Sequence, residues 1–446
     1  MELDDAYANI HLPQEIRRER LGKRDSAYAT NLCYGTLRLQ GRWDAIAAHC
    51  IDGKELADLD PEVRVVLRLG LHQLLELGTP PHAAINESVN LARNEVGTGA
   101  SGLINAALHR ASERPLSSWR SQLLDDAGGS PNSVVFLSTW FSHPGWIIRA
   151  LDAALKASGR SHKDLLSVLM ADNTPAPVAL AARDISVAQL RADIERGKMR
   201  SSLGKLVDSA VLLEGGDPGR VFAVKDALAG VQDEGSQLVA RIAANAPISG
   251  RDALWLDMCA GPGGKAATMA SIAAQRGAEL RANEPHEHRL ELVEQAVAPW
   301  DDIVALRLGD GRDLGQREPG IYDRVLVDAP CTGIGALRRR PESRWRKQAS
   351  AALDLAKLQG ELLDSAWGAV RPGGVITYST CSPYLRETRD VISAFLSRFP
   401  GAELLDAPCI ASSQALSELS GTDNMLQLWP DLHHSDAMFV AVLRKN

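Results

Sequence analysis

The chain has 446 residues, too many for a single hydrophobic core, so two or three domains are expected. Hydrophobic residues make up 45% and charged residues 24%, as in ordinary globular proteins, and no apolar run approaches the roughly 18 residues of a membrane span. The net charge of −7 argues against a nucleic-acid partner unless the positive groups are concentrated in one place.

The start of the chain and its cysteines both indicate a reducing compartment. Asp4 and Asp5 do not fit the basic and then apolar build of a signal peptide, which predicts a cytoplasmic protein without membrane association. The six cysteines contain no C-x-x-C pair, which argues against a zinc ribbon. We therefore expect free thiols and no metal site.

The first quarter of the chain has apolar residues at helical spacing from Glu15 to about Arg114, which predicts an all-α domain over residues 1–125. The segments Leu67–Leu75, Pro80–Val89 and Leu103–Arg110 resemble the NusB-like RNA-binding domain. Domains of that type usually open with an amphipathic helix, yet few residues precede Tyr7 here. We expect that the natural start lies upstream or that this helix has been lost.

A polar stretch and a smaller module follow. Residues 115–130 are rich in Asp, Gly and Ser, which predicts a linker. Residues 131–230 are expected to form linker helices and a small α+β module. Its predicted elements are helices at Ile147–Leu155 and Val187–Ile194, and strands at Val178–Ala182, Val207–Leu213 and Arg220–Val224.

The remaining residues, 231–446, alternate short apolar runs with helical patterns, which predicts βα units and a parallel sheet. The predicted strands are Leu254–Met258, Glu279–Asn283, Ile303–Leu308, Arg324–Val327, Gly374–Ser379 and Ala437–Leu443.

The first of these strands leads into a glycine-rich loop at Cys259–Lys265. A P-loop needs glycine at the position of Cys259 and Ser or Thr at Ala266, and the dinucleotide fingerprint needs a third glycine further on, so both interpretations fail. A turn from a strand into a helix still offers unpaired N–H groups to a ligand. A cofactor loop is favoured, with a tight structural turn as the alternative.

Acidic residues follow three later strands: Glu284, Asp310 and Asp328. Carboxyl ends of parallel strands meet at one edge, where such carboxylates accept hydrogen bonds from ribose hydroxyls and an adenine amino group. Two cysteines, Cys331 and Cys381, also follow strands and would project into the same crevice. For Cys33, Cys50 and Cys409 simple burial is the expected role.

Six basic residues fall within ten positions, opposed only by Glu342: Arg338, Arg339, Arg340, Arg344, Arg346 and Lys347. A solvated loop is the plain interpretation. The position just after Cys331 favours a stretch that contacts RNA phosphates. That second interpretation predicts RNA contacts from Arg338, Arg339, Arg340, Arg344, Trp345 and Arg346. Trp345 and Tyr378 are candidates to stack on a base, with core packing equally open for Tyr378.

Three segments together, Asp257–Lys265, Asp328–Pro341 and Tyr378–Pro383, closely resemble the RsmB/Nop/Sun family of S-adenosylmethionine-dependent RNA cytosine-C5 methyltransferases. The resemblance implies a class I, Rossmann-like methyltransferase domain with a mixed seven-stranded sheet. It also implies S-adenosylmethionine as cofactor and ribosomal RNA as partner. The loop departs modestly from the family pattern at Gly261 and Ala266.

The resemblance also implies the site residues. Those expected to bind the cofactor are Cys259, Ala260, Gly261, Pro262, Gly263, Gly264, Lys265, Glu284, Arg289, Asp310 and Asp328. Cytosine C5 needs activation by a thiolate at C6, and the family gives that role to Cys381. Cys331 is expected to act in product release, and Asp328 to contact the N3/N4 edge of the base. The role of Lys265 stays open.

Two other functions stay open. A DNA cytosine methyltransferase places its nucleophile in a segment like Pro330–Cys331, although Cys381 and the NusB-like head favour RNA. A non-catalytic RNA-binding or assembly factor is the second alternative, and the presence of Asp328 and both cysteines argues against it. The chain is expected to act as a monomer. The sequence does not identify the modified cytidine or its RNA context.

Overall fold

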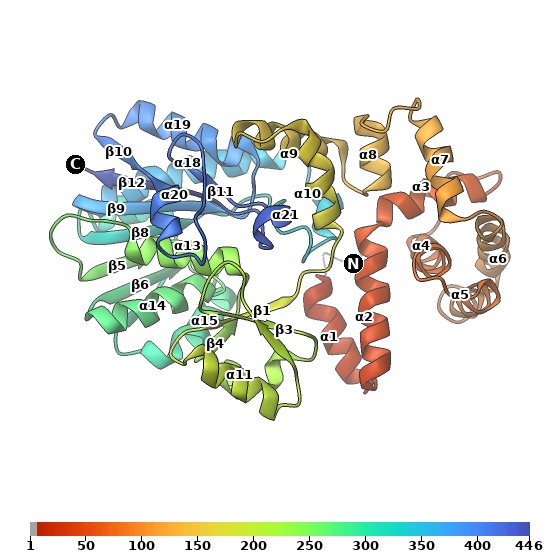
Figure 1. The fold of residues 1–446 in the computed structure, drawn as a ribbon, viewed down its shortest axis with the longest axis horizontal. Coiled ribbons are helices and arrows are strands. Elements are labelled where there is room, and N and C mark those ends of the chain that lie inside the picture. The colour runs from red at the N-terminus through yellow and green to blue at the C-terminus, as the bar shows by residue number, and fades with distance from the viewer. Residues whose placement is uncertain (1–6) are drawn as a thin grey trace. The chain divides into compact units, whose positions relative to one another are not determined.

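The computed structural model describes residues 7–446 and separates them into two compact units (Figure 1). The first contains the described residues up to Arg149 together with the later segment Leu337–Lys347. The second contains Ala150–Ala336 and Gln348–Asn446. Residues 1–6, on which the expectations about the start of the chain fall, lie outside the described part. The division at residues 125, 131 and 231 remains a prediction.

The first unit is helical, as the sequence predicts. Its helices are α1 (Ala8–Arg18), α2 (Lys23–Arg38), α3 (Gln40–Cys50), α4 (Pro61–Leu75), α5 (Pro81–Glu95), α6 (Thr98–Ser112), α7 (Leu116–Asp126), α8 (Val134–Trp140) and α17 (Ser343–Arg346), and α9 (Gly145–Ala157) begins in it. Proline opens α4 and α5, where its missing N–H removes no helical hydrogen bond. Trp43, Leu67 and Leu108 pack in a common core.

The expected linker over residues 115–130 is wrong, because most of it forms helix α7. Trp119 and Leu123 are almost fully buried in the helical core, and the Trp119 indole N–H donates to the Ala111 carbonyl at 3.1 Å. Residues four apart lie on the same side of a helix, so two large apolar residues are enough to hold a mostly polar helix in place.

The small module forms a four-stranded antiparallel sheet in the order β2-β3-β1-β4. Its elements are β1 (Val178–Ala182), α11 (Val187–Arg196), β2 (Ser201–Leu203), β3 (Ala210–Leu213), α12 (Phe222–Lys225) and β4 (Ala229–Val231), preceded by α10 (Leu165–Asp172). The predicted strand at Arg220–Val224 is wrong. Pro218 opens a 3-10 turn there, and Asp217 caps it by accepting from the Gly219 N–H. β2 and β4 are too short to show periodicity.

The main sheet runs β10-β12-β9-β8-β5-β6-β7. Its strands are β5 (Leu254–Asp257), β6 (Glu279–Glu284), β7 (Val304–Leu308), β8 (Tyr322–Asp328), β9 (Val370–Thr380), β10 (Ala402–Leu405) and β12 (Phe439–Lys445), and β11 (Leu426–Gln427) pairs with β12 as an eighth strand. β5 to β9 are mutually parallel, whereas β12 is antiparallel to both neighbours. The predicted mixed seven-stranded sheet is therefore confirmed, with β11 added at its side.

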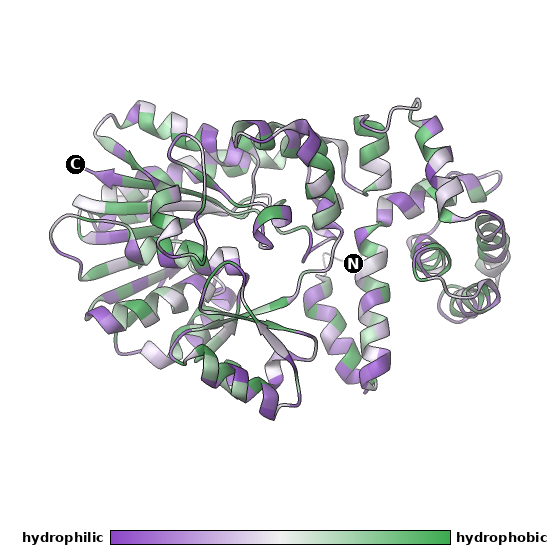
Figure 2. Ribbon diagram, in the orientation of Figure 1, coloured by the Kyte–Doolittle hydropathy of each residue, from purple (hydrophilic) through white to green (hydrophobic). Residues whose placement is uncertain are grey.

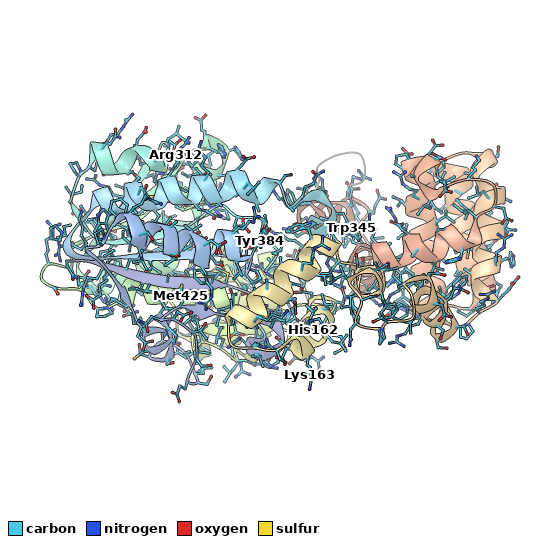
Figure 3. All side chains as sticks on the ribbon, turned by 90° about the horizontal axis from the view of Figure 1, so that it is seen from above. His162, Lys163, Arg312, Trp345, Tyr384 and Met425 are labelled. Atoms are coloured by element: carbon cyan, nitrogen blue, oxygen red, sulfur yellow. The ribbon has the colours of Figure 1, made fainter. Side chains whose placement is uncertain are left out.

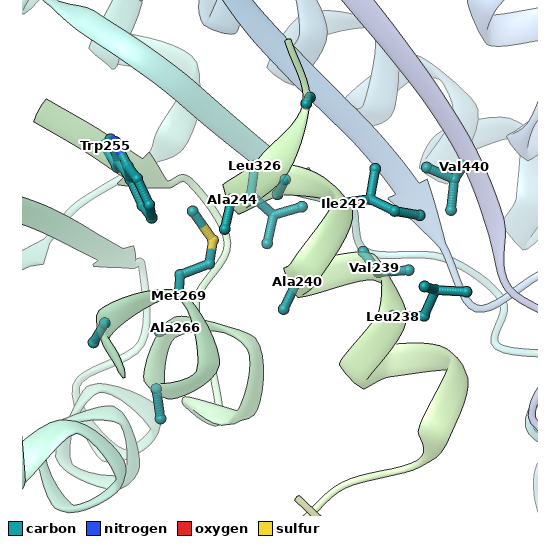
Figure 4. Packing of buried hydrophobic residues seen from close by; sticks show 14 of the residues in the cluster. Leu238, Val239, Ala240, Ile242, Ala244, Trp255, Ala266, Met269, Leu326 and Val440 are labelled. Carbon is teal, nitrogen blue, oxygen red and sulfur yellow. The ribbon is translucent and has the colours of Figure 1, made fainter. Parts of the chain in front are cut away.

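Helices cover both faces of this sheet. They are α13 (Glu234–Asn245), α14 (Gly264–Arg276), α15 (Glu287–Val297), α16 (Leu314–Arg317), α18 (Ala351–Ala369), α19 (Arg389–Arg398), α20 (Ala407–Ser412) and α21 (Pro430–His433). Alternate strand residues enter different cores: Trp255 and Leu326 pack with α13 and α14 (Figure 4), whereas Leu256 and Val325 pack with α18. Figure 2 shows the amphipathic helices as alternating hydrophobic and hydrophilic stripes. No described helix is both long and apolar enough to cross a bilayer.

Candidate active site

Five parallel strands bring the predicted site residues to one edge of the sheet. Because β5 to β9 run in the same direction, their carboxyl ends lie together. Glu284 ends β6, Asp328 ends β8 and Cys381 directly follows β9, while Cys259 and Asp310 come shortly after β5 and β7. The predicted row of acidic residues along one rim is therefore present.

The glycine-rich loop has no room for side chains. A Cβ on Gly261 would lie 2.2 Å from Glu284 Oε2, and Gly263 has a left-handed φ of +98° with Ala296 Cβ only 2.6 Å from where its own Cβ would be. Helix α14 begins directly after this turn, so its first N–H groups face the loop without helical partners. This backbone cradle fits a ligand that binds close to the main chain.

Glu284 lies against the cofactor loop and is 1% exposed. Its carboxylate accepts from the Gly261 and His286 N–H groups at 3.2 Å each. Arg289 lies 3.6 Å from Glu284 Oε2 and donates to the Gly261 carbonyl at 2.6 Å. The structure thus brings Glu284, Arg289 and the loop together. Arg289 holds the loop through its contacts with Gly261 and Glu284.

Asp257, at the end of β5, is a site residue that the sequence reasoning missed. It is fully buried, and burial, with the Asp328 carboxylate as the second cause, raises its pKa to about 7. Oδ1 accepts from the Cys259 N–H at 3.3 Å, but Oδ2 accepts no hydrogen bond from any described residue. An unpartnered buried acceptor beside the loop fits a ligand that carries hydrogen-bond donors. The sequence signal for Asp257 was its position at the end of a strand, just before the glycine-rich loop.

Lys265 pairs with Asp328. Its Nζ lies 2.8 Å from Asp328 Oδ2 and donates to Ser236 Oγ at 3.3 Å. Burial lowers the pKa of Lys265, but the Asp328 carboxylate outweighs it, so the pKa lies above its ordinary value. Ser379 Oγ donates to the other Asp328 oxygen at 2.9 Å. Asp328 is therefore held in a fixed orientation at the end of β8.

The two strand-end cysteines face each other with 3.4 Å between their sulfur atoms. The hydrogen bond between them raises the pKa of Cys331, and burial adds to that rise. The same hydrogen bond lowers the pKa of Cys381, with Lys265 acting in the same direction and burial and Asp328 opposing. The pKa of Cys381 is thus lowered and that of Cys331 raised, which favours Cys381 as the thiol that ionises.

Asp310 lies further out on the rim, with 40% of its side chain exposed. Arg312 binds both of its carboxylate oxygens, and this hydrogen bonding lowers the pKa of Asp310 (Figure 3 labels Arg312). Arg312 also pairs with Glu361 at 3.0 Å. Asp310 is thus an exposed, ionised acceptor, unlike the buried Glu284.

The basic segment Leu337–Lys347 belongs to the helical unit, and its members differ in exposure. Arg344 is fully buried and donates to the carbonyls of Arg38 at 2.7 Å and Ser142 at 3.2 Å. The expectation that Arg344 contacts RNA is therefore wrong, because its guanidinium ties helices together. Arg338 is also buried.

The outer part of the same segment is accessible. Arg340 is exposed and Trp345 is 40% exposed (Figure 3), whereas Arg339 and Arg346 are half-buried. Arg346 lies over the Tyr7 ring, 4.9 Å from its centroid. Tyr378, the other proposed stacking residue, is fully buried and donates to the Glu387 carbonyl at 2.7 Å, so it serves the core.

Two family models match the chain. The NusB family matches residues 1–113, and a family described as 16S rRNA methyltransferase RsmB/F matches residues 245–444.

Within the part that the structure describes, no group of three His, Cys, Asp or Glu residues is arranged to hold a metal ion.

Curated relatives extend over nearly the whole chain. A protein of Mycobacterium tuberculosis (strain ATCC 25618 / H37Rv), described as a candidate methyltransferase, is 42% identical over 99% of this chain and 93% of its own. Ribosomal RNA small subunit methyltransferase B of Pseudomonas putida is 33% identical over 95% and 91%. The probable enzyme of that name from Bacillus subtilis is 30% identical over 100% and 96%.

Solved structures share the fold. The crystal structure of PH0851 superposes with a TM-score of 0.79 at 20% identity, covering 97% of this chain and 93% of the other. NSun6 from Pyrococcus horikoshii, solved with SFG, gives a TM-score of 0.53 at 16% identity over 66% and 97%.

Proposed function

Because this chain belongs to the RsmB/F family of 16S rRNA methyltransferases, with a NusB domain at its N-terminal end, we propose that it methylates C5 of a cytidine in small-subunit ribosomal RNA. The observation that carries the choice of C5 is the pair of strand-end cysteines, Cys331 and Cys381, with 3.4 Å between their sulfur atoms and with the pKa of Cys381 lowered. Because the proposed substrate is ribosomal RNA, we expect the protein to act in the cytoplasm.

Chemistry at C5 explains why a thiolate is needed. Cytosine C5 is a weak nucleophile, so Cys381 adds to C6 and pushes electron density onto C5. The new carbon bond at C5 then leaves a proton there that must be removed before the sulfur–C6 bond breaks. Cys331 lies beside the sulfur that departs, which supports its assignment to this later step. The target base must leave any stack, since C6 is attacked from above the ring.

S-adenosylmethionine, the cofactor of this family, supplies an electrophilic methyl group when bound. The residues that fit it are the Cys259–Lys265 loop, the buried Glu284, the exposed Asp310 and the unpartnered oxygen of Asp257. Arg289 holds the loop by donating to the Gly261 carbonyl. These groups offer main-chain N–H donors and carboxylate acceptors, which match a ligand with ribose hydroxyls and amino groups.

Asp328 is suited to hold the cytosine edge. Lys265 and Ser379 each use one lone pair of its two oxygens, which leaves further acceptor positions for the base amino group. The Lys265 charge stabilises the carboxylate and lies close enough to Cys381 to favour its thiolate. One cation thus supports both groups.

The proposal is tested by incubating the purified protein with small-subunit rRNA and S-adenosylmethionine, followed by nucleoside mass spectrometry. The expected product is 5-methylcytidine, and bisulfite sequencing then locates the position. DNA of the same sequence is the control and should give no product. Methylation of a different atom, or of DNA in preference to RNA, would overturn the proposal, and a failure to bind S-adenosylmethionine would favour a non-catalytic role.

Glu284→Ala should weaken S-adenosylmethionine binding by about 1–3 kcal/mol, the range for hydrogen bonds to a charged group. The carboxylate borders the loop at Gly261, so its loss also frees Arg289 from its ion pair. Calorimetric titration of the cofactor measures the effect. RNA affinity serves as the control and should stay the same; equal cofactor affinity in both proteins would place the ribose acid elsewhere.

Asp257 should make the folded state less stable as the pH rises. Its folded pKa of about 7 lies above the ordinary value of 3.8, so its stabilising contribution is complete below about pH 4 and lost as the pH rises through about 7. Between about pH 5 and about pH 8 the loss is on the order of 3 kcal/mol. Denaturant unfolding at both pH values should show a smaller loss in Asp257→Asn. The same pH dependence in both proteins contradicts the raised pKa.

Arg339→Ala combined with Arg340→Ala should raise the KM for RNA and flatten the salt dependence of RNA binding. Each phosphate contact that is lost reduces by about one the number of counterions that the RNA releases on binding. Binding is measured across a salt series. A matched variant, Arg317→Ala with Arg398→Ala, removes two other exposed arginines, each of which has an acidic partner. If both double variants give the parent slope, the segment is a solvated loop.

A further inference from the structure

Each of the two cysteines is followed directly by a residue with a hydroxyl group, and both hydroxyls donate to one carboxylate. Thr332 Oγ1 donates to Glu387 Oε2 at 2.5 Å, and Ser382 Oγ donates to the same oxygen at 2.6 Å. The Thr332 N–H donates to the other oxygen, Oε1, at 2.7 Å. Glu387 therefore joins the residue after Cys331 to the residue after Cys381.

Glu387 is placed by its own surroundings. It ends the 3-10 turn η6 (Leu385–Glu387) and is fully buried, and its carbonyl accepts from the buried Tyr378 hydroxyl at 2.7 Å. Among the described residues it forms no ion pair, and its carboxylate accepts three hydrogen bonds instead. Hydrogen bonds to a charged group are short and strong, which makes such a carboxylate a stiff connection.

The rest of the Cys331 loop is held at its two ends. Before the cysteine, Ala329 N–H donates to the Ser379 carbonyl at 2.9 Å; after it, Gly335 N–H donates to the Cys381 carbonyl at 2.9 Å. A Cβ on Gly335 would lie 2.3 Å from the Ala437 carbonyl, so this end cannot shift easily. The segment between these anchors contains Cys331, and the Thr332 contacts fix its middle.

We propose that Glu387 is a positioning residue that sets the placement of both thiols and thereby controls two steps of the reaction. Its hydrogen bond to Thr332 holds the neighbouring Cys331 for product release, and its hydrogen bond to Ser382 holds the neighbouring Cys381 for attack on C6. The inference rests on the proposed function, because it uses the steps assigned to the two cysteines. It adds a buried residue that hydrogen-bonds the neighbours of both cysteines.

The two hydrogen bonds of Glu387, to Thr332 and to Ser382, can be tested separately. Thr332→Val keeps the shape but loses the hydroxyl, and should slow breakdown of the protein–RNA bond by about tenfold to a hundredfold, the size of effect that a small misplacement produces. Thr332→Ser keeps the hydroxyl and should restore release. Ser382→Ala should slow single-turnover methyl transfer without prolonging the bond. Glu387→Gln, which keeps the volume but replaces one acceptor by a donor, should affect both steps.

Two measurements separate positioning from mere stability. Methyl transfer is followed in a single turnover, and the lifetime of the protein–RNA bond is followed after quenching on denaturing gels. If a residue only stabilises the fold, its substitution lowers the melting temperature of the protein and leaves the lifetime of the protein–RNA bond unchanged. The exposed Glu418→Gln is the matched control and should behave as the parent in both measurements.

Cys331→Ala is the reference in the same experiment. If it accumulates a protein–RNA species while Thr332→Val and Glu387→Gln release as fast as the parent, the positioning role is wrong and the proposed function stands. If Cys331→Ala itself accumulates none, the assignment of the release step is wrong and the inference falls with it. Prolonged lifetimes in Thr332→Val and Glu387→Gln, reversed in Thr332→Ser, support the positioning role.

Discussion

Cys381→Ala is expected to abolish methyl transfer, with a loss of roughly 10⁴-fold or more, as for removal of other catalytic nucleophiles. Alanine cannot bond to C6, so C5 is never activated and no covalent species forms. The Cys331 thiol is a poor substitute, because burial still raises its pKa when the hydrogen bond to Cys381 is gone. Transfer of labelled methyl groups to small-subunit rRNA in a single turnover measures the loss.

The controls for this variant follow from where the cysteines lie. Cys409, on helix α20, is exposed, so its expected burial is wrong, and Cys409→Ala should retain the parent rate. Binding of RNA and of S-adenosylmethionine should persist in Cys381→Ala, because the cofactor loop and Glu284 are untouched. Substantial methylation by Cys381→Ala would exclude it as the nucleophile.

Cys331→Ala is expected to methylate its RNA once and then remain joined to the product. The Cys381 thiolate can still attack C6, but the group beside the departing sulfur is missing. The protein should therefore run on a denaturing gel as a protein–RNA species that forms only with S-adenosylmethionine. Turnover should stop after the first cycle, so the retained fraction is expected to approach one RNA per active site.

The double variant Cys331→Ala, Cys381→Ala is the decisive control, and it should form no such species. An adduct in Cys381→Ala with none in Cys331→Ala would exchange the two roles. The mechanism would then correspond to that of DNA cytosine methyltransferases, in which the cysteine after proline attacks.

Secondary structure and the main site segments follow from local patterns. β6 begins and ends where the apolar run and its terminal acid indicate, and the loop after β5 needs glycine because Cβ atoms would collide with Glu284 and Ala296. Errors occur where local signals are weak or shared. The sequence predicts a linker at helix α7 because most of its residues are polar and only two of them, Trp119 and Leu123, are buried. The strands β2 and β4 have three residues each, too few for a period.

By itself, the sequence determined the helical head, the parallel βα domain and the set of chemical groups at its strand ends, because helix and strand periods, turn residues and the alternation of strands and helices along the chain are local properties. Tertiary structure alone decided which groups meet: Lys265 with Asp328, Glu387 with Thr332 and Ser382, and Arg344 with main-chain carbonyls. Burial and charge partners depend on residues far apart in the chain, and these raise the pKa of Asp257 and lower that of Cys381.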